Sequence, residues 1–200
     1  WRWFESWCRG VVGKDGQVET LVNIVRDISE RKQRDEQLAI AALTDPLTGL
    51  PNRRAFRNAA AEENIEQRSG VTALALIDID YFKAVNDRYG HDAGDHVLTG
   101  FAVVAQRMLR RDDIIARVGG EEFAIIFPGL DLQNAAKACD RIRAAVANTA
   151  FPTAAGSVRI TLSGGVALLG SDGLDGALRR ADRALYEAKA KGRDRLSLAA

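Results

Sequence analysis

Two carboxylates end an apolar stretch of this sequence. The stretch VTALALIDID, residues 71–80, is nearly continuous in apolar residues and has the length of a strand, which is typical of a central strand covered on both faces. Asp78 and Asp80 have the same parity along such a strand, so both side chains can leave one face. Because burying a carboxylate without a partner is costly, something must pair with these acids.

A second acidic point lies in RVGGEEFAIIF, residues 117–127, where Gly119 and Gly120 are followed at once by Glu121 and Glu122. The flanks IIARV and FAIIF are rich in isoleucine, valine and phenylalanine, and they predict two short strands. Gly-Gly between such strands signals a hairpin, since glycine supplies the positive φ of hairpin turns. On that interpretation the glutamates are only polar turn residues.

A different interpretation follows if the hairpin lies beside the strand that ends in Asp78. Asp78 and Glu121 would then converge at the edge of the sheet. Paired carboxylates with few bases nearby favour a hard divalent cation, and Mg²⁺ usually adds substrate phosphates to one or two carboxylates. Gly119 and Gly120, without side chains, would let a polyphosphate approach the backbone N–H groups. These residues therefore indicate a metal ligand beside a gap of phosphate size.

The elements that must position these residues alternate between helices and strands around the hairpin. The patterns predict helices over residues 52–68, 93–110, 131–148 and 173–191, and strands over residues 71–80, 158–168 and 195–198. Residues 44–51 are loop-like, and Asn52 is expected to cap the first helix. This order predicts an α/β (α+β) fold with a mixed central sheet flanked by helices, a ferredoxin-like arrangement with additions.

Residues 1–28 differ from the rest of the chain. WRWFESWCRGVV and VETLVNIVRDI predict two strands joined by the turn GKDGQ, and two strands are too few to stand alone, so we interpret them as the end of an earlier domain. Residues 29–43 predict a mostly polar helix with Ser29 as its N-cap. Its narrow stripe of Leu38, Ala42 and Leu43 suits a connector or a short coiled coil, and equally a solvated linker helix.

Composition excludes several classes. The chain has 28 basic and 27 acidic residues and a net charge of +1, which indicates no nucleic-acid polymer as partner and no membrane-surface patch. Cys8 and Cys139 have no CxxC partner, so we expect no disulfide framework, no zinc site and a reducing, cytoplasmic location. No apolar stretch approaches the roughly 20 residues of a membrane span. The sequence begins at Trp1 without a methionine, so we expect a fragment of a longer protein. The full-length protein is expected to have an upstream sensor domain, and regions outside this fragment could attach it to a membrane.

Five blocks in order resemble the GGDEF domain of diguanylate cyclases, over residues 44–198 of an expected domain 44–200. They are DPLTGLPNRR at 45–54, DIDYFKAVNDRYGHDAGD at 78–95, RVGGEEF at 117–123, SGGVA at 163–167 and ALYEAKAKGRDR at 184–195. GGEEF replaces GGDEF, a change that the family accepts. The N-terminal segment ending in VNIVRDISERKQRDEQL is similar to the last strands of a PAS domain and the helix that follows it.

The resemblance implies a nucleotidyl-cyclase-like fold and a reaction. Two GTP molecules would condense to cyclic di-GMP and two pyrophosphates, each 3′-hydroxyl attacking the α-phosphorus of the other GTP. Each domain would hold one GTP, so a catalytic homodimer is implied. The cofactor would be Mg²⁺ or Mn²⁺, held by Asp78, Glu121 and the carbonyl of Ile79. Glu122 would complete the catalytic set at the reacting end, in contact with metal or ribose.

The resemblance also implies the substrate-binding residues. Asn86 and Asp95 would bind guanine, since a carboxylate accepts from its N1–H and N2 amine. Lys83, Lys189 and Arg193 would bind the triphosphate, beside Phe82, Gly119 and Gly120. From the residues alone, Lys189 and Arg193 are four apart and are expected to share a helix face, where they could be ordinary cations at a helix C-terminus. Asn86 could equally be a cap or turn residue, and the role of Asp80 stays open.

A further pattern precedes the hairpin. Arg110 and Asp113 match the RxxD pattern, which in this family marks an inhibitory site for the product, and Arg141 would be a second contact. Because RRDD lies at the end of a helix, we expect the pair to be exposed. Two alternatives to an active cyclase stay open: a non-catalytic domain that binds GTP or cyclic di-GMP as a receptor, and a cyclase of mixed base choice that makes cyclic GMP-AMP.

Overall fold

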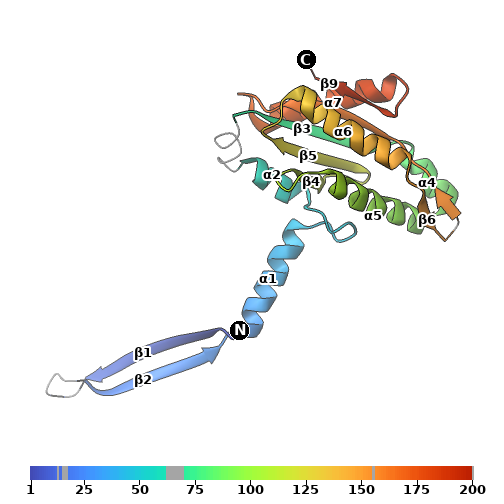
Figure 1. Ribbon diagram of the computed structural model, residues 1–200. Coiled ribbons are helices and arrows are strands. Elements are labelled where there is room, and N and C mark those ends of the chain that lie inside the picture. Colours follow the sequence, from blue (N-terminus) through green and yellow to red (C-terminus); the bar gives the residue numbers. More distant parts are fainter. Residues whose placement is uncertain (13, 15–17, 62–69, 155, 200) are drawn as a thin grey trace. The chain divides into compact units, whose positions relative to one another are not determined.

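The computed structural model describes residues 1–12, 14, 18–61, 70–154 and 156–199 (Figure 1). Contacts divide the chain into two compact units, Trp1–Ala42 and Leu43–Ala200. No helix in these described ranges combines the length and the apolar character that crossing a membrane requires.

The first unit contains an antiparallel ribbon and a helix. β1 (Phe4–Val12) pairs with β2 (Val18–Asp27), and α1 follows over Ser29–Leu43. The expected turn between the strands lies almost wholly outside the described residues. The N-cap prediction is wrong, because Ser29 is the first residue of α1 and the Lys32 N–H donates to the Ile28 carbonyl at 2.9 Å. The Ser29 hydroxyl instead accepts from the Trp3 N–H at 2.9 Å. Of the predicted stripe, Ala42 is exposed, whereas the Leu38 side chain lies outside the description.

The second unit contains helices and strands in alternation. In chain order they are α2 (Arg53–Ala61), β3 (Thr72–Ile79), α4 (Phe82–Tyr89), α5 (His91–Met108), β4 (Ile114–Arg117), β5 (Glu122–Pro128), α6 (Leu132–Ala147), β6 (Phe151–Thr153), β7 (Gly156–Val158), β8 (Leu162–Leu168), α7 (Gly173–Ala190) and β9 (Arg195–Leu198).

A five-stranded mixed sheet forms the centre of this unit, in the order β4-β5-β3-β8-β9. β3 pairs antiparallel with both β5 and β8, β4 pairs antiparallel with β5, and β8 pairs parallel with β9. The predicted mixed α/β fold is therefore confirmed. β3 is the central strand, and seven of its eight residues are buried, as the continuous apolar run predicts.

Helices cover both faces of the sheet (Figure 1). Residues of one parity of β3, such as Ile77, share a core with Phe101 of α5 and Ile142 of α6. The other parity, beginning with Leu74, packs in a smaller cluster that includes Ala181 of α7. Asp78 has this second parity, so its side chain leaves the sheet on the side of α7.

The structure departs from the predicted elements in two places, and a third prediction can be followed only in part. Asn52 caps α2 as predicted, its Oδ1 accepting from the Arg54 and Ala55 N–H groups at 3.0 Å, but the expected end of that helix at residues 62–69 lies outside the described residues. The helix α4 was not predicted, because its two buried residues give little periodic signal. The predicted strand 158–168 is divided, since β8 begins at Leu162 and β7 pairs instead with β6.

Candidate active site

The carboxylates of the two acidic segments meet where β3 ends. The antiparallel register of β3 and β5 places Asp78 opposite Glu122, and the Ile79 N–H donates to the Glu121 carbonyl at 3.3 Å. The convergence predicted for Asp78 and the hairpin is confirmed. Asp78 is 6% exposed, so its charge requires a partner.

Lys189 supplies that partner. Its Nζ lies 2.8 Å from Asp78 Oδ2. Burial nevertheless raises the pKa of Asp78, the Lys189 ammonium opposes that rise, and the negative charges of Glu121 and Glu122 add to it. One ammonium therefore faces three carboxylates, an excess of negative charge that a divalent cation would neutralise.

These donors fit a hard divalent cation. All are oxygens, and Mg²⁺ needs only one or two carboxylates when water and substrate phosphates complete its shell. In the part of the chain that the structure describes, no three His, Cys, Asp or Glu side chains already form a metal-binding cluster.

The turn that carries the glycines is not the predicted kind. Residues 118–121 separate β4 from β5, and neither Gly119 nor Gly120 has a positive φ. A Cβ on Gly119 would lie 2.2 Å from Glu122 Oε2, so glycine at this position leaves space for the Glu122 carboxylate. A Cβ on Gly120 would meet nothing within 4 Å, so this side of the turn has room for a ligand.

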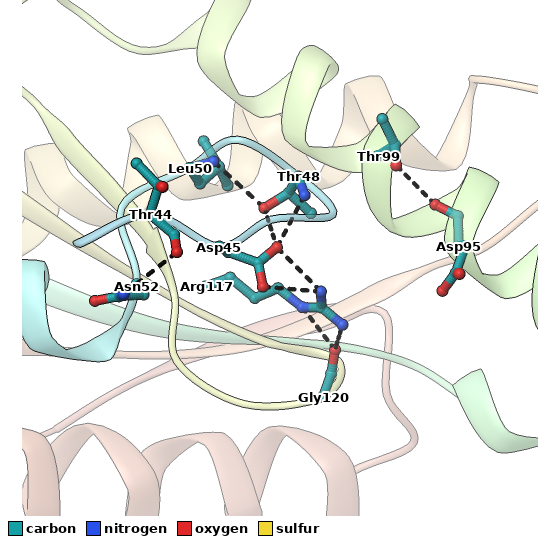
Figure 2. Close-up of polar contacts among 9 residues, drawn as sticks. All are labelled: Thr44, Asp45, Thr48, Leu50, Asn52, Asp95, Thr99, Arg117 and Gly120. Atoms are coloured by element: carbon teal, nitrogen blue, oxygen red, sulfur yellow. Dashed lines mark hydrogen bonds and ion pairs between the residues drawn. The ribbon is translucent and has the colours of Figure 1, made fainter. Parts of the chain in front are cut away.

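An arginine that sequence reasoning missed holds this turn (Figure 2). Arg117 Nη1 donates to both carboxylate oxygens of Asp45 at 3.1 and 3.2 Å, while its Nε and Nη2 donate to the Gly120 carbonyl at 3.0 and 2.7 Å. Asp45 also accepts from the Thr48 N–H at 2.9 Å and hydroxyl at 2.6 Å. The spacing of Asp45 and Thr48, typical of a side-chain turn, was the available signal.

Lys189 and Arg193, two of the predicted phosphate ligands, do not share a helix face, so that prediction is wrong. α7 ends at Ala190, and the chain reverses at Gly192 with a φ of 109° before Arg193, whose φ is 63°. The Arg193 guanidinium stacks over the Tyr81 ring at 4.4 Å from its centroid. Both cations still reach the end of β3, Lys189 at Asp78 and Arg193 at Tyr81.

The predicted base-binding residues lie on two adjacent helices. Asn86 belongs to α4, and its Oδ1 approaches α5 so closely that a Cβ on Gly94 would lie 1.9 Å away. The next residue, Asp95, is exposed and lines a hollow of about 360 Å³ whose apolar walls include Leu47 and Pro152. Sequence reasoning missed both Gly94 and Leu47. Of the other predicted ligands on α4, Phe82 is buried and Lys83 is exposed.

The two residues of the RxxD pattern, Arg110 and Asp113, form an ion pair with one another. Arg110 Nη2 lies 3.0 Å from Asp113 Oδ1, and the Arg110 N–H donates to Asp113 Oδ2 at 2.8 Å. The expectation of an exposed pair is wrong for Asp113, whose side chain is 2% exposed, against 52% for Arg110. The backbone bond turns the carboxylate inward. Arg141 is exposed on α6. Burial raises the pKa of the Cys139 thiol, the negative charge of Asp113 adds to that rise, and the positive charge of Arg141 opposes it.

Comparison with known proteins adds independent findings. Residues 42–195 match the family model described as diguanylate cyclase, GGDEF domain. The chain is 44% identical over 161 residues to diguanylate cyclase DgcP of Pseudomonas aeruginosa, and 40% identical over 176 residues to diguanylate cyclase DgcM of Escherichia coli K12. These matches cover 79% and 86% of this chain but only 24% and 42% of the relatives.

A solved structure of similar fold supports the same family. The coiled coil and GGDEF domain of DgcB from Caulobacter crescentus, in complex with c-di-GMP, superposes with a TM-score of 0.79 at 34% identity. The match covers 86% of this chain and 93% of that one.

Proposed function

The chain belongs to the diguanylate cyclase GGDEF-domain family, and on that premise we propose that it condenses two GTP molecules into cyclic di-GMP and two pyrophosphates in the cytoplasm. One observation carries the proposal: Asp78, Glu121 and Glu122 converge beside Lys189 at the ends of neighbouring strands. Acid residues so placed, next to a turn with room for a ligand at Gly120, suit phosphoryl transfer.

Asp78, Glu121 and the carbonyl of Ile79 would hold Mg²⁺ or Mn²⁺. When bound, the ion neutralises phosphate charge and lowers the pKa of a nearby hydroxyl. The Lys189 side chain would then exchange its ion pair with Asp78 for one with the phosphates. Glu122, opposite Asp78 in the register, would stand at the reacting end, in contact with metal or ribose.

The remaining residues would fix the nucleotide. Asp95 would accept from guanine N1–H and the N2 amine, while the Asn86 amide would bind another polar edge of the base. The apolar hollow beside Asp95 has space for a planar ring. Lys83 and Arg193 would bind the triphosphate together with Lys189.

The reaction needs two copies of this domain, since each would hold one GTP. The 3′-oxygen of one GTP forms a bond to the α-phosphorus of the other, and the bond from that phosphorus to pyrophosphate breaks. The hydroxyl proton leaves to a base or to water. A second such step, with the roles of the nucleotides exchanged, closes the ring. We therefore propose a homodimer as the active species.

Two further roles belong to the same proposal. Arg110, Asp113 and Arg141 would bind cyclic di-GMP as an inhibitor, with the exposed Arg110 as the main contact. β1 and β2 would be the end of a PAS-like sensor domain over residues 1–28, joined by a linker helix over residues 29–43 to a cyclase domain over residues 44–200.

Chromatography of the products after incubation with GTP and Mg²⁺ tests the function directly. Cyclic di-GMP and pyrophosphate in a ratio of one to two are the expected products. Tight binding of GTP or cyclic di-GMP without turnover would instead show a receptor. A parallel incubation with GTP and ATP together tests base choice, and a mixed cyclic dinucleotide would contradict the guanine assignment of Asn86 and Asp95.

A further inference from the structure

The second acid of the DID segment, Asp80, is buried and has no role in the function proposed above. It is 4% exposed, and it follows directly on the last residue of β3. Among the described residues no lysine, arginine or histidine forms an ion pair with it. A buried carboxylate without a cation must be satisfied by hydrogen bonds, and its donors show what it holds.

Three donors from two segments converge on Asp80. The Ser163 hydroxyl donates to Oδ1 at 2.7 Å, and the Thr161 hydroxyl donates to Oδ2 at 2.7 Å. The third donor is the backbone N–H of Asp194, 3.1 Å from Oδ2, in the connection between α7 and β9. Both carboxylate oxygens are therefore engaged by the protein itself, and Asp80 joins the start of β8 to the segment that follows α7.

Backbone strain gathers at the same place. The non-glycine residues with positive φ in the described part of the chain are Tyr81, Arg193 and Asp194, with values of 55°, 63° and 46°. Residues other than glycine occupy this left-handed region at a cost, and they keep it only where surrounding contacts enforce it. Tyr81 is the neighbour of Asp80 in sequence, and Asp194 is bonded to it, so one carboxylate lies at the centre of all three.

Two of these residues, Arg193 and Tyr81, form a cation–π pair. Arg193 lies with its guanidinium 4.4 Å from the centroid of the Tyr81 ring, and its Nη1 donates to the Tyr81 hydroxyl at 3.3 Å. Tyr81 is 65% exposed, so the stacked pair faces solvent beside the end of β3. If Asp194 left the left-handed region, the preceding peptide would turn and the guanidinium would leave the ring.

We propose that Asp80 is a positioning residue: by holding the left-handed backbone at Asp194, it keeps Arg193 stacked on Tyr81 and aimed at the triphosphate of GTP. The inference rests on the proposed function for the identity of the anion. It differs from a role as a third metal ligand, because both oxygens of Asp80 already accept from protein donors. It also differs from a purely structural role, because it predicts that loss of Asp80 weakens binding of the triphosphate and leaves binding of the guanosine part unchanged.

Calorimetry with Mg²⁺ and two probes tests the proposal on the whole chain. One probe is a GTP analogue whose α,β-bridge cannot be cleaved, and the other is guanosine, which has the base without phosphates. The unaltered protein is expected to bind the analogue more tightly than guanosine. If it binds neither probe, the proposed function fails at this first step, separately from the role of Asp80.

Asp80→Ala is expected to weaken binding of the analogue by about tenfold or more and to leave guanosine unchanged, the loss expected for one charged hydrogen-bonding group. The double variant Asp80→Ala with Arg193→Ala should bind no more weakly than Arg193→Ala alone, because both changes remove the same contact. Equal weakening of both probes, or additive losses in the double variant, would overturn the proposal.

Two conservative variants complete the experiment. Asp80→Asn should bind the analogue like the unaltered protein, since an amide oxygen can accept from Asp194 and Thr161 while its NH₂ donates to Ser163; a loss equal to that of the alanine variant would contradict positioning. Asp172→Asn, which removes a carboxylate paired with Arg180 at the other end of α7, is the matched control and should bind normally.

If circular dichroism shows that Asp80→Ala does not fold, Thr161→Val makes the same comparison. It removes one of the three donors and keeps the side-chain shape. A smaller but equally selective loss of analogue binding is expected, and unchanged affinity for the analogue would contradict the proposal.

Discussion

Three carboxylates and one ammonium group lie near the end of β3, where the negative charge exceeds the positive charge. Asp78 is paired with Lys189, and Glu121 and Glu122 add negative charge at short range. Because burial already disfavours the ionised form of Asp78, each further negative charge raises the affinity of the site for a cation. At the scale of single residues the proposed chemistry therefore depends on charge more than on shape.

Asp78→Asn and Glu121→Gln are each expected to abolish turnover of GTP while leaving the fold intact. The loss of metal charge at the phosphates is worth several kcal/mol, or about a hundredfold or more in rate. Product chromatography measures the rate and circular dichroism the fold. Glu187→Gln, which removes an exposed carboxylate paired with Lys191 on α7, is the control and should stay active. A folded variant of Asp78 or Glu121 with normal turnover would refute the metal assignment.

Asp45 provides a pH-dependent test of the arginine contact that holds the turn. Burial acts to raise its pKa, but hydrogen bonds from Thr48 and Arg117 outweigh that effect and hold the pKa below its ordinary value of 3.8. A depressed carboxyl pKa contributes stability above 3.8, and that stability is lost as pH falls through the folded-state pKa.

Asp45→Asn should therefore lower the free energy of unfolding by about 1–3 kcal/mol at neutral pH, through weaker hydrogen bonds to Arg117. The difference in Tm between the variant and the unaltered protein should narrow as pH falls below about 4. Thermal melts followed by circular dichroism across this range check the prediction. A gap that stays constant down to pH 2 would show that the Asp45 charge contributes nothing.

At the scale of elements, the close approach of the α7 and β8 backbones sets the position of Lys189 at the site. A Cβ on Gly165 of β8 would lie 2.0 Å from the Ala181 carbonyl oxygen and 2.4 Å from the Leu185 nitrogen of α7. A helix backbone cannot yield like a flexible side chain. Gly165 thus sets the distance between α7 and the sheet, and with it the position of Lys189.

Gly165→Ala is expected to destabilise the protein by about 1–3 kcal/mol or more, because it overpacks a helix against a strand. Gly120→Ala is the matched control for stability, since its added methyl group would meet nothing within 4 Å. Urea unfolding should show an unchanged midpoint for Gly120→Ala and a lower one for Gly165→Ala. Equal midpoints for the two variants would mean that α7 shifts freely on the sheet.

At the scale of the whole molecule, the proposed reaction requires two domains to meet, and one domain holds only half of the reacting groups. Specific activity should therefore rise with enzyme concentration in the dilute range. Product formation across a dilution series, with light scattering for the molecular mass, measures this dependence. Constant specific activity from a protein that stays monomeric would contradict the shared reaction.

The proposed product inhibition also belongs to the scale of the whole molecule. Arg110 can bind a cyclic dinucleotide through its planar fork, which suits phosphate and a guanine edge and stacks on a base. Arg110→Ala should keep the initial velocity and lose the slowing that added cyclic di-GMP causes. Kinetic assays with added product check this, and calorimetry should show unchanged binding of the GTP analogue. Inhibition of the variant at the same product concentration would leave Arg110–Asp113 as a surface ion pair, worth about 0–1 kcal/mol.

Much of this protein was predictable because its signals are local. The apolar run 71–80 has the composition of a strand buried on both faces, and β3 is the central strand. Asn52 precedes a helical pattern, and its side chain accepts hydrogen bonds from the first turn of α2. The acids at the ends of two neighbouring apolar runs were expected to converge, and the antiparallel pairing of the runs brings those ends together.

Contacts between distant segments could not be predicted in this way. Arg117 and Asp45 are 72 residues apart, and Asp80 and Asp194 are 114 apart, so no local pattern joins them. Lys189 and Arg193 were assigned to one helix face by their spacing, but the chain reverses at Gly192. Sequence alone determined which residues carry charge and which segments are strands. The tertiary structure decided which charges meet, because the register of β3 and the packing of α7 depend on the whole core.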